Sequence, residues 1–144
     1  LIVEVWEDCG TVESLLRTNR YLLRQRVSNG QGGVNSIIIP PVYIAESASV
    51  TNSIVGPHVH IGERSTVMDS IIGPYVSLSP DSQVINSIVK DSIINEGSLI
   101  EAAMLSSSLI GQNATVRGTF ERLNVGDFSE IDSSMRIISD QDQD

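Results

Sequence analysis

Aliphatic residues recur through the middle of the chain at steps of six, six and five, which sum to a period of 17 residues. The segment Asn-Ser-Ile-Val-Gly-Pro at 52–57 returns as Asp-Ser-Ile-Ile-Gly-Pro at 69–74, and Asn-Ser-Ile-Val follows at 86–89. The recurring aliphatic positions, with a few shortened steps after Val84, are Ile38, Ile44, Val50, Val55, Ile61, Val67, Ile72, Leu78, Val84, Val89, Ile94, Ile100, Leu105, Ile110 and Val116.

A small residue stands two places before each of these aliphatic residues, and in every case it is Ser, Ala or Val. Side chains two places apart share one face of a strand, so the large and the small residue both point inward. The small positions are Ser36, Val42, Ala48, Ser53, Val59, Ser65, Ser70, Val76, Ser82, Ser87, Ser92, Ser98, Ala103, Ser108 and Ala114.

Three short strands in each 17-residue period predict a triangular coil, and successive coils stack at the strand spacing of about 4.8 Å. The fold class is therefore all-β: a single-stranded parallel β-helix with hexapeptide repeats and about five coils between Ile38 and Val116. Gly56-Pro57 and Gly73-Pro74 suit its corners. A β-sandwich is the alternative, but it spaces strands by about 8–12 residues and gives no reason for the small residues.

The residues directly before the inward aliphatic residues point outward. Burying three aliphatic side chains per coil, at about 1.5–3 kcal/mol each, does not offset ordering 17 residues at about 1–2 kcal/mol each. A partner surface is expected, and one outer face offers an apolar stripe. We predict that the stripe packs between subunits of a homo-oligomer, a trimer; the alternative is that the front helix covers it. The apolar stripe consists of Ile37, Ile54, Ile71, Ile88 and Met104.

The other two outer faces are more polar. Tyr43, His60, Ser77, Ile93 and Leu109 lie outward on the second face, and Ser49, Thr66, Gln83, Leu99 and Thr115 lie outward on the third.

The front of the chain has a different pattern. Leu1 to Trp6 reads as a strand, and apolar residues at helical spacing predict a helix from about Thr11 to Val27. Its predicted buried face contains Val12, Leu15, Leu16, Asn19, Leu22, Leu23 and Val27, with Thr11 as the N-cap. We divide the chain into a front segment at 1–35, the β-helix at 36–132 and an acidic, disordered tail at 133–144.

The composition restricts the classes of binding partner and the cellular compartment that we expect. A formal net charge of -9 excludes a broad nucleic-acid or anionic membrane surface. No apolar run reaches the roughly 20 residues of a membrane helix. The single cysteine, Cys9, cannot form an intrachain disulfide and fits the reducing cytoplasm.

The segment Trp6-Glu7-Asp8-Cys9-Gly10-Thr11, followed by Leu15-Leu16, Asn19-Arg20 and Leu22-Leu23, resembles part of the sugar-1-phosphate nucleotidyltransferases. Members with a C-terminal β-helix, such as long-form glucose-1-phosphate thymidylyltransferases, also resemble this chain in the Asn-Ser-Ile-Ile-Gly repeats and in Leu123-Asn124-Val125-Gly126-Asp127. The resemblance implies a left-handed β-helix. It also implies an enzyme that joins a sugar 1-phosphate to a nucleoside triphosphate and releases pyrophosphate, of the dTDP-glucose type.

The same resemblance implies that Asp8 helps to bind the catalytic Mg²⁺ in the intact enzyme. The family's Gly-rich phosphate-binding signature and its nucleotide-binding strands are absent, and Gly30 and Gly32-Gly33 read as a linker. We therefore expect the chain to be the C-terminal part of such an enzyme, to lack the N-terminal nucleotidyltransferase domain, and to be catalytically inactive alone. No catalytic residue and no cofactor is expected in the isolated chain.

Two other enzyme activities are alternatives to the nucleotidyltransferase interpretation. Many hexapeptide β-helices are acyltransferases with a histidine base, for which the candidates are His58 and His60, two places apart on one predicted strand face. A zinc hydratase of the β-helical type would need three histidine ligands, and the chain has two. The third class is a purely structural, oligomerising or regulatory module.

Overall fold

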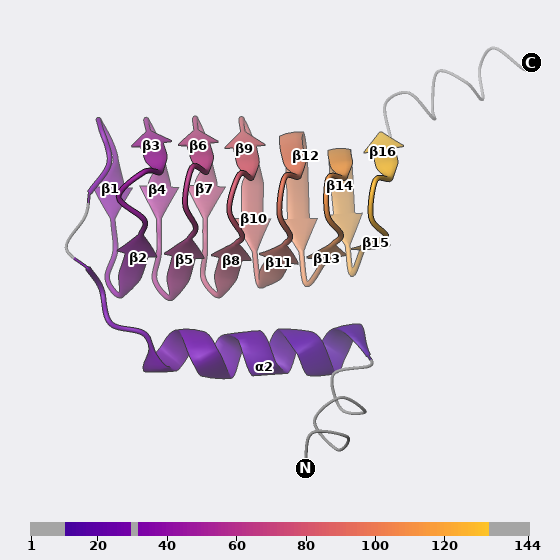
Figure 1. Ribbon diagram of the computed structural model, residues 1–144, viewed down its shortest axis with the longest axis horizontal. Coiled ribbons are helices and arrows are strands. Elements are labelled where there is room, and N and C mark those ends of the chain that lie inside the picture. Colours follow the sequence, from indigo (N-terminus) through magenta and orange to yellow (C-terminus); the bar gives the residue numbers. More distant parts are fainter. Residues whose placement is uncertain (1–10, 30–31, 133–144) are drawn as a thin grey trace, which may run out of the picture.

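The computed structural model of this protein describes residues 11–29 and 32–132 (Figure 1). The predicted strand at Leu1–Trp6, Asp8, Cys9, part of the predicted linker and the tail at 133–144 lie outside the described residues. One helix, α2 (Val12–Gln25), precedes a stack of short parallel strands. The stack is the predicted β-helix (Figure 1).

The strands lie on three faces. On the first face are β1 (Ile37–Ile38), β4 (Ile54–Val55), β7 (Ile71–Ile72), β10 (Ile88–Lys90) and the later parts of β12 (Leu99–Ser106) and β14 (Thr115–Glu121). On the second face are β2 (Val42–Ile44), β5 (Val59–Ile61), β8 (Val76–Leu78), β11 (Ser92–Ile94), β13 (Leu109–Ile110) and β15 (Asn124–Val125). On the third face are β3 (Ser49–Thr51), β6 (Thr66–Met68), β9 (Gln83–Ile85), the first parts of β12 and β14, and β16 (Glu130–Asp132).

The coil makes about six turns, because the second face alone is a sheet of six strands. The sequence predicted about five between Ile38 and Val116. The additional turn uses Phe120, Val125 and Ile131 as its inward residues, and all three pack in or against the core. An aromatic residue and irregular steps stand there in place of the regular aliphatic row, which is why the pattern ended early.

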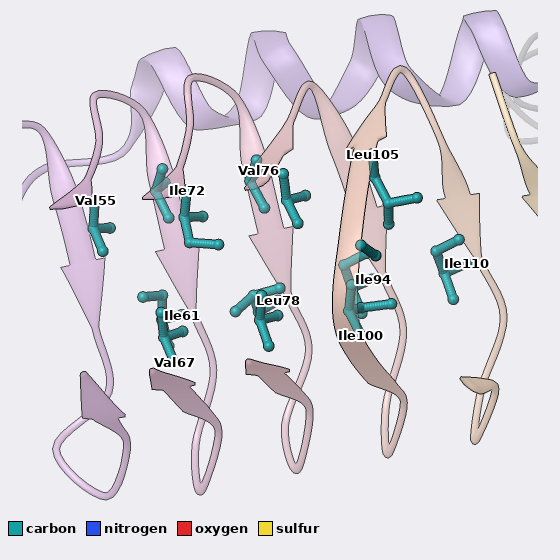
Figure 2. Close-up of a cluster of buried hydrophobic side chains, with 14 of the residues drawn as sticks. Val55, Ile61, Val67, Ile72, Val76, Leu78, Ile94, Ile100, Leu105 and Ile110 are labelled. Atoms are coloured by element: carbon teal, nitrogen blue, oxygen red, sulfur yellow. The ribbon is translucent and has the colours of Figure 1, made fainter. Parts of the chain in front are cut away.

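The core is one continuous column of aliphatic side chains inside the coil, as Figure 2 shows for ten labelled residues. Fourteen of the fifteen aliphatic residues predicted to point inward are buried, and Ile38 in the first coil is partly buried. Register pairs place each residue over its counterpart in the next coil, as for Val55 over Ile72. Each large side chain is therefore shielded by the coils on both sides.

Thirteen of the fifteen small inward residues are also buried, whereas Ser36 and Ala48 of the first coil are partly exposed. The serines among them connect successive coils. The hydroxyl of Ser53 accepts a hydrogen bond from the backbone N–H of Ser70 at 3.1 Å, and Ser70 accepts one from Ser87 at the same distance. The Ser70 hydroxyl also donates to the carbonyl of Met68 at 2.8 Å. Serine is thus small enough for the corner and polar enough to pair the backbone groups that are buried there.

Two of the corners need glycine. Gly56 has a φ of +112°, and a Cβ at this position would clash with the carbonyl oxygen of Ile39 in the coil before it. Gly73 occupies the same place one coil later, with a φ of +118°. Only glycine adopts this conformation and leaves room for the neighbouring backbone, so the Gly-Pro pairs do mark corners.

The helix α2 lies along the second face and runs from the later coils back toward the first coil (Figure 1). Thr11 caps it as predicted, since its hydroxyl accepts from the N–H of Ser14 at 3.0 Å. The helix ends at Gln25, so Val27 lies beyond it and is 80% exposed; Leu22 is 58% exposed. The buried side of the helix is therefore narrower than the predicted one and consists of Leu16, Asn19 and Leu23.

Candidate functional site

The apolar stripe lies on the first face and is exposed to solvent. In order along the coil, its side chains are 60%, 37%, 43%, 38% and 50% exposed. The strand register aligns them one above another, from Ile37 beside Ile54 to Ile88 beside Met104. Five large apolar side chains in one file form an uninterrupted exposed surface, which is the usual mark of a contact site.

Shallow hollows flank the first coils of this stripe. One, of about 460 Å³, is lined by residues of the first two coils, among them Asn35, Ser36 and Asn52. The other, of about 340 Å³, continues along Asp69, Ser70 and Asn86. The surface therefore has projecting isoleucine side chains with hollows beside them. Another set of side chains with the same regular spacing can fit into these hollows.

The alternative cover for the stripe, the front helix, lies elsewhere. Helix α2 contacts β8 and β11 of the second face. The amide of Asn19 accepts from the Ser77 hydroxyl at 2.5 Å and donates to the carbonyl of Tyr75 at 3.4 Å. Arg20 pairs with Asp91 at 2.6 Å. The helix thus occupies the second face and leaves the stripe on the first face uncovered by the described residues.

The two histidines do not share a strand face. His58 lies just before β5 with a φ of +59°, and its ring stacks on Tyr75, with centroids 5.0 Å apart. His60 lies within β5 and stacks on Tyr43 of the coil before it, also at 5.0 Å. The interpretation of a common face failed because His58 has the left-handed conformation of a corner residue, which the alternation rule for strands does not cover.

The environment of His60 is the more unusual one. It lies in a groove between α2 and the second face, of about 410 Å³, whose lining includes Asn19, Arg26 and Ser77. Burial lowers the pKa of His60 below its ordinary value of 6.5, and the positive charge of Arg26 lowers it further. The Nδ1 atoms of His58 and His60 are both buried without a hydrogen-bond partner among the described residues. A histidine base normally depends on such a partner to fix its ring.

The groove itself was not foreseen from the sequence. The sequence pattern predicts one outward file of Tyr43, His60 and Ser77, but it does not indicate that the helix covers this file. The available indication was Asn19, a polar residue in the middle of the predicted apolar side of the helix. A buried amide needs a polar partner, and the second face has the serine that supplies it.

Outside the groove, exposed ion pairs connect neighbouring coils. Arg64 donates to both carboxylate oxygens of Asp81, at 2.9 and 3.1 Å, and this hydrogen bonding holds the pKa of Asp81 below its usual value. Arg117 pairs with Glu101 at 2.9 Å. Exposed ion pairs of this kind add little to stability. We therefore interpret them as ordinary surface contacts between coils and not as a functional site.

The candidate metal ligand Asp8 lies outside the described residues. Within residues 11–29 and 32–132, no group of three or more His, Cys, Asp or Glu side chains could hold a metal ion. The same part of the chain has no helix that is long and apolar enough to cross a membrane.

Comparison with known proteins agrees with this geometry. Residues 21–91, from the second half of α2 through β10, match the family described as GlmU-like, C-terminal hexapeptide. No curated protein matches the chain. The stacked parallel coil and the family match together support a hexapeptide-repeat β-helix, of the left-handed type that the resemblance implied. The chain is similar to the C-terminal hexapeptide domains of that family.

Proposed function

We propose that this chain is the C-terminal β-helix of a sugar-1-phosphate nucleotidyltransferase and acts as its oligomerisation module, without catalysis of its own. The observation that carries the proposal is the exposed apolar stripe, Ile37, Ile54, Ile71, Ile88 and Met104, on a coil similar to C-terminal hexapeptide domains. In the intact enzyme, Asp8 contributes to binding of the catalytic Mg²⁺.

The partner we propose for the stripe is a second copy of the same chain. The side chains of the stripe repeat once per coil, at the strand spacing of about 4.8 Å. Another copy presents the same repeat, so its isoleucines meet the hollows beside the stripe row for row. With a formal charge of -9 per chain, copies repel one another over most of their surface. The stripe residues carry no charge, so contact there costs the least repulsion.

Closed rotational symmetry limits such an assembly to a small number of copies, and a trimer is the arrangement we propose. Each copy would place its first face, with the apolar stripe, toward a common axis. The second face, with α2 on it, would remain on the outside of the assembly.

The test is a charge placed in the middle of the stripe. Ile71→Asp is compared with Gln83→Asp, a change to an exposed residue on the third face, by light scattering after size-exclusion chromatography. We expect the wild type and Gln83→Asp to have the mass of three chains and Ile71→Asp to have the mass of one. An Ile71→Asp variant that keeps the assembly of the wild type would refute the role of the stripe.

The catalytic part of the proposal is tested separately. Turnover of a sugar 1-phosphate with dTTP or UTP is measured for this chain alone and for the chain joined to a nucleotidyltransferase domain. We expect turnover with the added domain only. Consumption of acetyl-CoA by the isolated chain would instead favour an acyltransferase that uses His58 or His60.

A further inference from the structure

The groove between α2 and the second face places a titratable ring next to a fixed positive charge. His60 stacks on Tyr43 with an angle of 6° between the rings. The guanidinium carbon of Arg26, just after α2, lies 5.2 Å from the centre of the same tyrosine ring. Tyr43 thus connects the histidine of the coil to the arginine that ends the helix.

Among the described residues, no negatively charged group lines this groove. The groups that face His60 come from β2, β8 and the end of α2, and only the arginine among them is charged at neutral pH. A protonated His60 would therefore meet a like charge without a carboxylate to balance it. These facing groups are Tyr43 from β2, Ser77 from β8, and Asn19, Leu22, Leu23, Gln25 and Arg26 from the helix side.

The helix is held on the coil by few contacts, so a small change in free energy can shift it. Only Leu16, Asn19 and Leu23 of α2 are buried. At its C-terminal end, the buried Leu23 is accompanied by polar and aromatic contacts, such as the bond from Arg24 to the Tyr75 hydroxyl at 3.1 Å. Elements with little buried apolar surface open locally at low cost.

We propose that His60 is a pH-sensitive latch for α2: neutral His60 allows the end of the helix and Arg26 to rest on the second face, and protonation releases them. Release frees the segment in front of the coil to move relative to the coil. The latch depends only on contacts within one chain, so it is independent of the oligomerisation proposed above.

The direction of the effect follows from the pKa of His60. Burial and the charge of Arg26 lower this pKa below 6.5 in the docked state, whereas released His60 returns toward 6.5. The docked state therefore binds fewer protons than the released state. Docking is fully stable above pH 6.5 and weakens as the pH falls from 6.5 through the lowered pKa. The total loss is about tenfold in the docking equilibrium for each unit between the two pKa values.

Amide hydrogen exchange of the intact chain between pH 7.5 and pH 5, corrected for intrinsic exchange rates, measures docking at α2. NMR titration of the His60 ring in the same samples gives its pKa. We expect protection of the α2 amides to fall as His60 titrates, by a factor that matches the displacement of its pKa from 6.5. The amides of β8 and β11 should keep their protection throughout.

Three variants separate the latch from general acid sensitivity. His60→Phe keeps a ring that can stack on Tyr43 and cannot titrate, so protection of α2 should no longer depend on pH. His58→Phe is the matched control, because His58 also stacks on a tyrosine, and it should retain the pH dependence. Arg26→Gln should move the His60 midpoint upward. Constant protection down to pH 5 in the wild type, or pH dependence that persists in His60→Phe or disappears in His58→Phe, would overturn the proposal.

Discussion

A buried serine in this coil both accepts and donates a hydrogen bond, which alanine and valine at equivalent positions cannot do. Ser70 is 3% exposed, accepts from the N–H of Ser87 and donates to the carbonyl of Met68. The sequence predicted that a small residue points inward here. It did not predict the hydrogen bonds, because the residue type at a position indicates the size of the side chain and not where the backbone N–H of the next coil lies.

Replacing Ser70 with alanine should therefore destabilise the coil. Ser70→Ala leaves the N–H of Ser87 buried without its partner, which costs about 1–3 kcal/mol in the free energy of unfolding. Urea denaturation at one fixed protein concentration measures the loss. Ser49→Ala changes an exposed serine on the third face and should alter the stability by less than about 0.5 kcal/mol. Equal effects from the two changes would contradict this role for inward serines.

One corner residue is chemically out of place. Asn35, Asn52, Asp69 and Asn86 stand at successive corners with φ between 51° and 53°, and Ala102 takes the corresponding position in the next coil with a φ of 50°. Asparagine and aspartate tolerate this left-handed conformation, whereas it costs alanine about 1–2 kcal/mol.

Ala102→Asn should raise the thermal midpoint of unfolding, by relieving a cost of about 1 kcal/mol. Ala102→Val should lower the midpoint, since a β-branched residue is a poorer fit to a positive φ. Differential scanning calorimetry of the two variants distinguishes them. A lower midpoint for Ala102→Asn than for the wild type would show that this corner is not strained.

At the level of elements, polar contacts in the middle of α2 hold the helix on the second face, because few apolar side chains of the helix are buried there. Asn19 is 8% exposed and bonds to both Ser77 and the backbone of Tyr75. The sequence predicted the helix, its N-cap and most of its length. The face it covers was not predictable, because the pairing of one amide with one serine, 58 residues apart, leaves no periodic pattern.

Asn19→Ala should loosen α2 without unfolding the coil. The loss of two bonds to a buried amide costs about 1–3 kcal/mol of docking, which corresponds to roughly five- to 150-fold faster trypsin cleavage after Arg20 and Arg24 at pH 7.5. Tyr21→Ala, which changes a side chain that is 60% exposed, is the matched control and should change the cleavage rate by less than about twofold. Unchanged cleavage in Asn19→Ala would mean that the helix is held by other contacts.

At the level of the whole molecule, the repeat determines both the shape of the coil and the position of the apolar stripe. A period of two along each strand and of 17 along the chain assigns inward and outward residues, so both the core and the apolar stripe could be predicted from the sequence. The groove around His60 could not, because it is formed by two elements whose docking is set by side-chain contacts. The coil could be predicted because its sequence repeats, whereas the groove depends on contacts that do not repeat.

We propose that the apolar stripe holds copies of the chain together. Sedimentation equilibrium of the unaltered chain over a hundredfold range of concentration tests this claim most directly. We expect a mass of three chains that persists toward the dilute end of the range. A mass of one chain at every concentration would contradict it.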